Sequence, residues 1–280
     1  MNSIKKVAAI NDLSGFCRCS LAVAMPCFSA LGIWCCPLPT AILSNHTGYE
    51  KFFFDDYTEK MNPYWKKWEE NGIEFDAIYT GFLGSVVQID IVMEFIKKFK
   101  NENNIVVIDP VMGDDGVLYS TYTKDMQNEM KKLIKYADVI TPNVTECSFL
   151  SDTAYTGEDV SIDTVRKMCK KIEGVKSIVV TGIRNDDKII NYIYNTQTQE
   201  EEIVSRKAND VYYAGTGDVF SSVLCGCLTN GMPLKKAVEK SALFVEKAVN
   251  LSVELGIDHK EGLAIEKCLI DLMGETLWEH

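Results

Sequence analysis

The chain has 280 residues, of which 46% are hydrophobic and 25% charged, and its 40 acidic and 29 basic side chains give a formal net charge of −11. This composition is typical of a globular protein with one large core, and we expect residues 1–280 to form a single domain. The acidic balance argues against nucleic acid and anionic membrane surfaces as partners, although it leaves room for a local site that binds a phosphorylated small molecule.

The first half of the chain alternates short apolar runs with stretches of helical period. Gly32 ends the first predicted helix and Gly72 is the predicted C-cap of the second, while Ser85 and Gln88 have the spacing of a capping box at the start of the third. The predicted strands are 4–10, 34–43, 76–80 and 105–108, and the predicted helices are 20–31, 59–71 and 85–101.

The second half continues this alternation and ends in two long helices. Residues 189–194 and 202–205 are expected to form an antiparallel hairpin. The other predicted strands are 139–140 and 177–180, and the other predicted helices are 124–136, 161–173, 217–229 and 234–255. Alternating strands and helices predict an α/β fold with a mostly parallel central sheet that helices cover on both faces.

The cysteines and the N-terminal segment indicate the cellular compartment in which the protein works. Ten cysteines occur beside three histidines, and no two cysteines have C-x-x-C spacing, a pattern that favours free thiols in a reducing cytoplasm over a zinc site. The first apolar run ends at Ile10, which is too short for a signal peptide. No charged residue lies between Arg18 and Glu50, but prolines and polar residues interrupt this stretch, and we interpret it as a helix, a turn and a strand. We therefore expect a cytoplasmic protein without a membrane segment.

The most specific motif is Gly215-Thr216-Gly217-Asp218 at the start of a predicted helix. Backbone N–H groups of the first three residues can converge on an anion, assisted by the helix dipole. Asp218 would lie in the first helical turn beside that anion, where a carboxylate can take the proton of an attacking hydroxyl in phosphoryl transfer. The alternative is a glycine-rich turn in which Asp218 only complements the helix dipole. The chain lacks a P-loop, and Phe220 occupies the third glycine position of a dinucleotide-binding fingerprint.

Carboxylates follow the apolar strand 105–108. Asp109 comes directly after the strand, and a turn adds Asp114 and Asp115. Carboxylate oxygens at a strand end suit Mg²⁺, which commonly takes one or two carboxylates together with phosphate oxygens. Ordinary turn chemistry is the alternative, because Asp, Gly and Pro are common turn residues.

The strand at 139–140 is followed by a third polar cluster, Thr141 to Glu146. Asn143 and Glu146 are three residues apart, so both side chains can share the first turn of a helix near the same metal and phosphates. When this segment is considered alone, an asparagine-capped helix is the favoured interpretation.

Small or polar residues also follow three other predicted strands, at 11–15, 44–49 and 80–85. They offer hydroxyl, amide and imidazole groups to a small polar ligand, although a lone histidine such as His46 is more often structural than catalytic. Ligands of open α/β sheets bind at the carboxyl ends of the strands. The sequence therefore predicts a site at that edge of the sheet.

In order and spacing, these motifs resemble those of the ribokinase superfamily, and within it the pyridoxal/pyridoxamine kinases. The resemblance extends over about residues 5–255. It depends on Ser-Asn-His-Thr at 44–47, Thr-Gly-Phe-Leu-Gly-Ser at 80–85, Asp-Pro-Val-Met-Gly-Asp at 109–114, Thr-Pro-Asn-x-x-Glu at 141–146 and Gly-Thr-Gly-Asp at 215–218. It implies a ribokinase-like three-layer fold and an ATP-dependent kinase that phosphorylates the 5′-hydroxymethyl group of a vitamin B6 vitamer, with Mg²⁺ and a monovalent cation such as K⁺ as cofactors and a homodimer as the assembly.

The resemblance also implies site roles. Asp218 would be the general base, and Gly215, Thr216 and Gly217 would form the anion hole for the γ-phosphoryl group. The residues implied for Mg²⁺ are Asp109, Asp114 and Glu146, those for ATP are Asp109, Thr141, Asn143, Glu146 and Thr181, and those for the pyridine ring are Asp12, His46, Thr47 and Phe82.

Three residues depart from the pattern of many pyridoxal kinases. Asp12 and Phe82 stand where a serine and a tyrosine are common, and Cys17 stands where close relatives have a glycine. An acid at position 12 is similar to the related hydroxymethylpyrimidine kinases. Two alternatives therefore stay open: a hydroxymethylpyrimidine kinase of thiamine synthesis, and a non-catalytic protein of this fold that binds a B6 vitamer or a nucleotide. The presence of Asp218 argues against the second.

Overall fold

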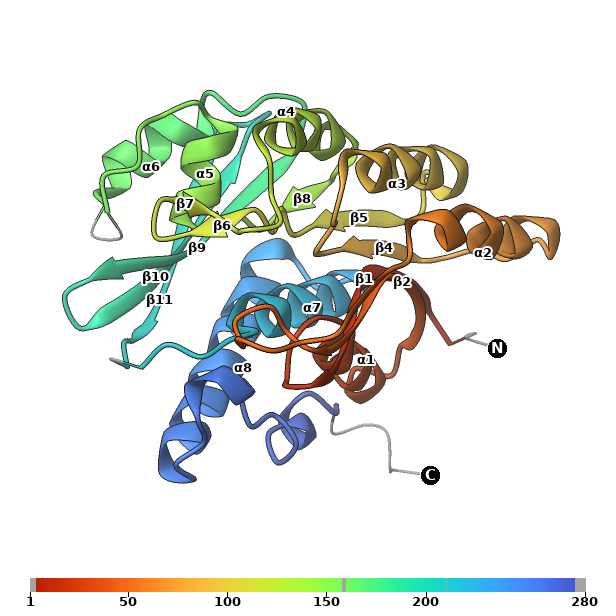
Figure 1. Cartoon of the computed structure of the whole chain (residues 1–280). Helices are drawn as coiled ribbons and strands as arrows, with labels where there is room; N and C mark the ends of the chain where they lie inside the picture. The colour runs from red at the N-terminus through yellow and green to blue at the C-terminus, as the bar shows by residue number, and fades with distance from the viewer. Residues whose placement is uncertain (1–3, 158–159, 210, 275–280) are drawn as a thin grey trace.

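The computed structural model describes residues 4–157, 160–209 and 211–274, which are built around one nine-stranded sheet (Figure 1). Its strands are β1 (Lys6–Phe16), β2 (Trp34–Asn45), β3 (Phe54–Asp56), β4 (Ala77–Thr80), β5 (Ile105–Ile108), β8 (Val139–Ile140), β9 (Ser177–Asn185), β10 (Lys188–Asn195) and β11 (Glu201–Lys207). Their order across the sheet is β11-β10-β9-β8-β5-β4-β1-β2-β3. Neighbours from β9 to β2 are parallel, and the pairs β2–β3, β9–β10 and β10–β11 are antiparallel.

Helices cover both faces of this sheet (Figure 1). One face carries α2 (Thr58–Glu70), α3 (Val86–Phe99), α4 (Lys124–Leu133), α5 (Val144–Leu150) and α6 (Ile162–Cys169), and the other carries α1 (Ser20–Ala30), α7 (Thr216–Thr229) and α8 (Leu234–Glu254). Each face has its own apolar core. The predicted three-layer α/β fold with a mostly parallel sheet is thus confirmed.

The sequences of the central strands are continuous apolar runs because both faces of these strands are buried. In β4, Ile78 packs in the core under α2–α6 while its neighbour Tyr79 packs in the core under α1, α7 and α8. In β5, Val106 and Val107 divide between the two cores in the same way. Alternation along a strand therefore sends successive side chains into different cores, as expected for a sheet covered on both sides.

Several local predictions differ from the structure. Ser85 is the N-cap of α3 and accepts a hydrogen bond from the Gln88 main chain at 3.2 Å, but the reciprocal half of the predicted capping box is wrong. The buried Gln88 side chain accepts instead from the Gly84 main chain and donates to the Thr40 carbonyl of β2. The short β3 and a hairpin of β6 (Gly113–Asp114) and β7 (Val117–Leu118) were not predicted.

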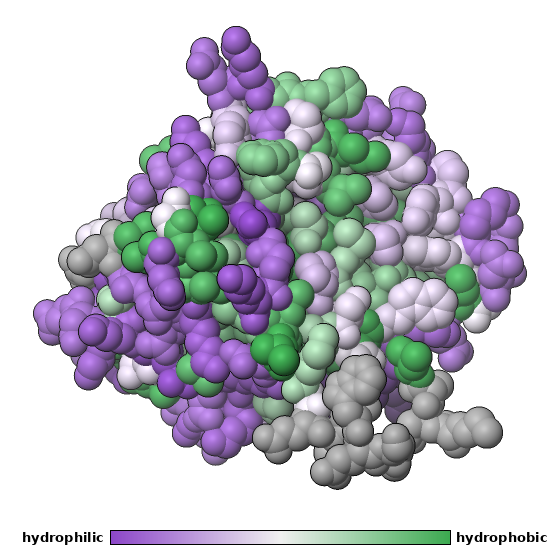
Figure 2. Space-filling model, turned by 90° about the horizontal axis from the view of Figure 1, so that it is seen from below, coloured by the Kyte–Doolittle hydropathy of each residue, from purple (hydrophilic) through white to green (hydrophobic). Residues whose placement is uncertain are grey.

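The uncharged stretch from Arg18 to Glu50 contains α1, a turn at Gly32 and β2, as predicted. Among the described residues, no helix has both the length and the apolar character needed to cross a membrane. Figure 2 shows the face on which α8 lies, where hydrophilic residues cover much of the surface and apolar residues lie among them.

Candidate active site

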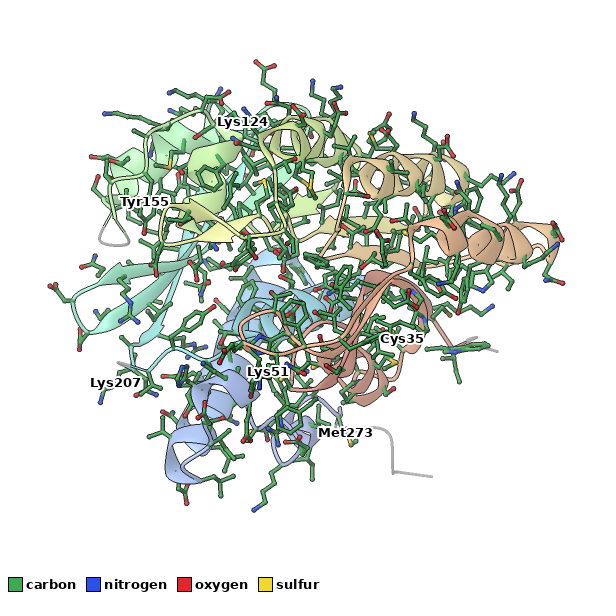
Figure 3. All side chains as sticks on the ribbon, in the orientation of Figure 1. Cys35, Lys51, Lys124, Tyr155, Lys207 and Met273 are labelled. Atoms are coloured by element: carbon green, nitrogen blue, oxygen red, sulfur yellow. The ribbon has the colours of Figure 1, made fainter. Side chains whose placement is uncertain are left out.

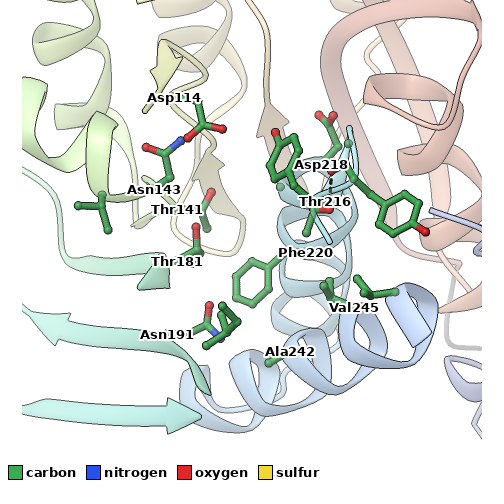
Figure 4. Close-up of a pocket in the computed structure, with 18 of the residues that line it drawn as sticks. Asp114, Thr141, Asn143, Thr181, Asn191, Thr216, Asp218, Phe220, Ala242 and Val245 are labelled. Atoms are coloured by element: carbon green, nitrogen blue, oxygen red, sulfur yellow. Dashed lines mark hydrogen bonds between the residues drawn. The ribbon is translucent and has the colours of Figure 1, made fainter. Parts of the chain in front are cut away.

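A cavity of about 300 Å³ lies where the carboxyl ends of β5, β8 and β9 approach the N-terminus of α7. Thr141, Asn143 and Thr181 line one side of it, and Thr216 and Asp218 stand at the start of α7 (Figure 4). Its apolar end is formed by Phe220 of α7 and by three residues of α8, Ala242, Val245 and Val249. The cavity therefore joins a polar end beside Asp218 to an apolar end between two helices.

The loop before α7 is shaped by Gly215. This residue is the N-cap of α7 with a φ of +75°, and a Cβ there would lie 2.2 Å from the carbonyl oxygen of Arg18. Thr216 donates its hydroxyl to the Tyr213 carbonyl at 2.7 Å. At Gly217, the nearest atom to an added Cβ would be Asp109 Oδ2 at 3.9 Å, so the main chain is open to the cavity. The backbone N–H groups of this loop can therefore meet an anion, as the sequence predicted.

Asp218 occupies the first turn of α7 and faces both the cavity and β1. Its Oδ1 accepts a hydrogen bond from Asn11 Nδ2 at 3.2 Å. Burial raises the pKa of Asp218 to about 6, and the nearby Asp12 carboxyl adds to the rise, while hydrogen bonds from the Ser20 main chain and Asn11 oppose it. A carboxyl with such a pKa is matched to proton transfer near neutral pH.

Asp109, directly after β5, is held by a short chain of hydroxyl groups. Ser221 donates to Asp109 Oδ2 at 3.0 Å, and Thr141 Oγ1 lies 2.8 Å from Ser221 Oγ. Burial and the neighbouring Asp218 carboxyl raise the pKa of Asp109 to about 7. Ser221 follows Asp218 by three residues, so both lie on the same face of α7.

Asn143 and Glu146 form the capping box of α5. Asn143 Oδ1 accepts from the Glu146 main chain at 2.8 Å, and Glu146 Oε2 accepts from the Asn143 main chain at 2.9 Å. Glu146 Oε1 accepts from the Met112 main chain at 3.0 Å. The asparagine-capped helix is therefore confirmed, although both side chains also line the cavity.

Asp109, Asp114 and Glu146 were predicted to hold Mg²⁺. Burial raises the pKa of all three carboxyls, and the charges of Asp109 and Asp114 raise the pKa of Glu146 further. In the described part of the chain, no three His, Cys, Asp or Glu side chains are close enough to hold a metal by themselves. The donor set thus fits a cation that also takes phosphate oxygens and water, as Mg²⁺ commonly does.

The residues predicted for the pyridine ring lie outside the lining of this cavity, on the β1 side of Asp218. Asp12 is buried and accepts from Ser14 at 3.0 Å, and the main chain of Phe82 donates to Asn11 Oδ1 at 2.8 Å. His46 accepts from the Gly48 main chain at Nδ1, so its Nε2 donates to the Lys260 carbonyl at 2.8 Å.

Both ring nitrogens of His46 are thus used by the main chain, and Thr47 is exposed. The structure brings Asp12 and the Phe82 segment to the general-base candidate. The hydrogen bond of His46 to the Lys260 carbonyl joins the loop after β2 to residue 260.

Sequence reasoning missed several residues that line the cavity or contact its carboxylates. Arg184, Arg206 and Lys207 come from β9 and β11 and surround the cavity with positive charge. Tyr155 and Lys207, labelled in Figure 3, contribute to its lining from the loop after α5 and from the end of β11. No motif marks them, because they come from strands and a loop whose sequences read as ordinary surface.

Comparison with known proteins assigns the family. A family model described as phosphomethylpyrimidine kinase matches residues 25–263. The chain belongs to this family. The chain is 32% identical to a pyridoxal kinase of Dictyostelium discoideum, and the aligned region covers 70% of this chain and 69% of the relative. It is 24% identical to a hydroxymethylpyrimidine/phosphomethylpyrimidine kinase of Haemophilus influenzae over 92% of its own length and 96% of the relative.

A solved structure is also similar to this family member. A protein of Bacteroides thetaiotaomicron with the provisional name phosphomethylpyrimidine kinase, crystallised with pyridoxal, is 39% identical and has a TM-score of 0.90 over 96% of each chain. The resemblance to the pyridoxal kinases of the ribokinase superfamily is confirmed, and the chain is an ATP-dependent phosphotransferase that acts on a small molecule.

Proposed function

We propose that this kinase transfers the γ-phosphoryl group of ATP to the 5′-hydroxymethyl group of pyridoxal, pyridoxamine or pyridoxine. The observation that carries the proposal is the place of Asp218, which borders the cavity on one side and contacts Asn11, next to Asp12, on the other. A carboxylate that lines the cavity and also lies next to the residues predicted for the acceptor ring suits a base that joins a nucleotide to an acceptor alcohol. The pyridoxal in the structure of the Bacteroides relative supports a B6 vitamer as that acceptor.

The cavity suits ATP. We assign the adenine to the apolar end beside Phe220 and Val245, and the phosphates to the polar end, where Thr141, Asn143 and Thr181 lie. Basic side chains of β9 and β11 offset the negative charge of a triphosphate. The affinity for a nucleotide thus comes from local groups in a chain whose net charge is −11.

The proposed reaction uses Asp218 as general base. Its carboxylate takes the proton of the hydroxymethyl group while the oxygen attacks the γ-phosphorus, and the bond to ADP breaks. The main-chain N–H groups of Gly215, Thr216 and Gly217 hold the charge on the transferred group. Asp109 and Asp114, with Glu146 beside them, would hold Mg²⁺, which neutralises phosphate charge when bound. A K⁺ requirement, a homodimer and a cytoplasmic location are further parts of this proposal that rest on resemblance.

The second candidate acceptor is hydroxymethylpyrimidine. The acid at Asp12 supports it, because burial raises the pKa of this carboxyl and such a group can pair with a ring nitrogen or an amine. The similarity to the Haemophilus influenzae kinase supports it as well.

A coupled assay of ADP release with pyridoxal, pyridoxamine, pyridoxine and hydroxymethylpyrimidine tests both candidates. We expect turnover with the B6 vitamers, and turnover with hydroxymethylpyrimidine alone would replace the proposal with the second candidate. Turnover with none of the four would favour a non-catalytic role. The variant Asp12→Ser should change the ratio of rates among the vitamers and retain the dependence on Mg²⁺, and unchanged ratios would make Asp12 structural.

A further inference from the structure

The side chain of Asn11 occupies an unusual position between the base and the predicted ring pocket. It is fully buried at the end of the core part of β1, and its Nδ2 donates to Asp218 Oδ1 at 3.2 Å. Its Oδ1 accepts two hydrogen bonds, from the Asp12 main chain at 2.9 Å and from the Phe82 main chain at 2.8 Å. Three polar contacts thus converge on one carboxamide.

These contacts leave the amide one orientation. The two main-chain N–H groups are obligatory donors, so the atom between them must be the oxygen, and a flipped amide would set donor against donor. The nitrogen therefore points at Asp218. Gly81 closes the remaining space, because a Cβ there would lie 2.3 Å from Asn11 Nδ2.

The backbone around Asn11 is also specialised. The register between β1 and β2 shifts between Asn11 and Leu13, which pair with Pro39 and Ile42. Such bulges are common beside active sites, where they change the direction of side chains. The shift in pairing between β1 and β2 thus coincides with the positions of Asn11 and Asp12.

We propose that Asn11 is a positioning residue, whose carboxamide orients the carboxylate of Asp218 and connects it to the main chain of Phe82. This inference rests on the proposed function, since it assigns Asp218 as the base and Phe82 to the acceptor pocket. One amide then fixes the position of the base relative to the segment that receives the acceptor ring. A shift of about 1 Å in such an arrangement costs on the order of 100-fold in rate.

The variant Asn11→Asp tests this directly. It is nearly isosteric and keeps an oxygen for the N–H groups of Asp12 and Phe82, but it replaces the donor to Asp218 with a second carboxylate oxygen. We expect kcat to fall about 10- to 100-fold while KM for MgATP stays within about twofold, because the nucleotide contacts are made by other elements.

Asn104→Asp is the matched control. Asn104 is also a buried amide with partners at both ends, but it lies away from the site: its Nδ2 donates to the Phe99 and Phe75 carbonyls, and its Oδ1 accepts from the Asn101 main chain. This variant should leave kcat unchanged, while melting temperatures report the cost of a buried carboxyl in each protein. If both variants lower kcat alike, or if Asn11→Asp leaves kcat unchanged, the positioning role is overturned.

A double variant separates positioning from general damage. In an Asp218→Ala background, Asn11→Asp should lower kcat by no more than about twofold further, because the two residues act as one unit. Multiplicative losses would overturn the proposal. Failure of the proposed function has a different signature, since the unaltered enzyme would then turn over no B6 vitamer.

Discussion

The hydroxyl of Ser221 donates a hydrogen bond to Asp109 Oδ2 at 3.0 Å and so joins α7 to the residue that follows β5. The same helix carries Asp218 one turn earlier. The Ser221 hydrogen bond therefore fixes the position of Asp218 relative to Asp109. It also lowers the pKa of Asp109, although burial raises this pKa by more.

Replacing Ser221 by alanine should remove this hydrogen bond between α7 and Asp109. Asp109 would lose the Ser221 donor and keep only the hydrogen bond of Thr141, so its pKa would rise further above its ordinary value, which disfavours the ionised form that a cation needs. A hydrogen bond to a charged group contributes about 1.5–3 kcal/mol, so we expect kcat/KM for MgATP to fall at least about tenfold. Steady-state kinetics with varied MgATP at saturating pyridoxal measure this kcat/KM. Ser241→Ala removes a similarly buried hydroxyl that donates to a carbonyl within α8, and this control should retain full activity.

Asp218→Asn tests the general base. The variant should bind ADP as the unaltered enzyme does, and its kcat should be about two to four orders of magnitude lower, as expected when a general base is lost. The pKa of Asp218 is raised to about 6, so the base loses its charge as the pH falls through that value. The kcat/KM of the unaltered enzyme should therefore decline below about pH 6, and the residual activity of the variant should lack this limb. Unchanged turnover would remove Asp218 from the mechanism.

Much of the site was predictable because parallel strands end at one edge of a sheet. Asp109 and Thr141 follow β5 and β8, and Thr181 lies in the neighbouring β9, and the structure places all three around the same cavity. The Gly-Thr-Gly-Asp motif predicted the open loop and the acid at the start of α7 from local chemistry alone.

The residues that sequence reasoning missed act through distant partners. Asn11 meets Asp218 across 207 residues of chain, and Ser221 meets Asp109 across 112, so no local pattern marks either contact. Elements without a full period were missed for a different reason. The three residues of β3 and the two residues each of β6 and β7 are too few for a periodicity of 2.0 residues to show in the sequence.

Gly215→Ala should damage both the fold and the reaction. A Cβ would meet the Arg18 carbonyl at 2.2 Å in a backbone conformation with φ of +75° that L residues rarely adopt. We expect a loss of about 2–4 kcal/mol in the free energy of unfolding and little residual kcat. Gly256→Ala provides the comparison, because this residue has a φ of +64° with no atom within 4 Å of the added carbon. Its loss should be about 1 kcal/mol with full activity, and equal losses would mean that the Arg18 contact has no part in the effect.

Asp109→Asn should stabilise the protein in the absence of ligands. The folded-state pKa of about 7 lies above the ordinary value of 3.8, so the contribution of this group to stability is fully present below about pH 4 and is lost as the pH rises through 7. Removing the charge should therefore raise the free energy of unfolding by about 1–3 kcal/mol at pH 7.5 and leave it unchanged near pH 4.

Denaturant titrations at the two pH values measure this difference. Asp138→Asn is the control, because Asp138 pairs with Lys176 and Lys100 and accepts from the Val106 main chain, so its variant should lose stability at pH 7.5. A stabilisation of Asp109→Asn that is equal at both pH values would show that charge burial is not its cause.

Cys17→Gly tests whether the backbone at position 17 is strained. Cys17 has a φ of +101°, a region that favours glycine, directly after β1. Relief of that strain is worth about 1–3 kcal/mol, whereas the added freedom of glycine in the unfolded chain costs about 0.5–1 kcal/mol, so we expect a net gain of about 1 kcal/mol. Cys36→Gly, in β2 with an ordinary φ, should instead lose about 1 kcal/mol. Thermal unfolding of both variants decides the point, and a loss of stability in Cys17→Gly similar to that of Cys36→Gly would show that the Cys17 side chain contributes more through its contact with Tyr49 than its backbone costs.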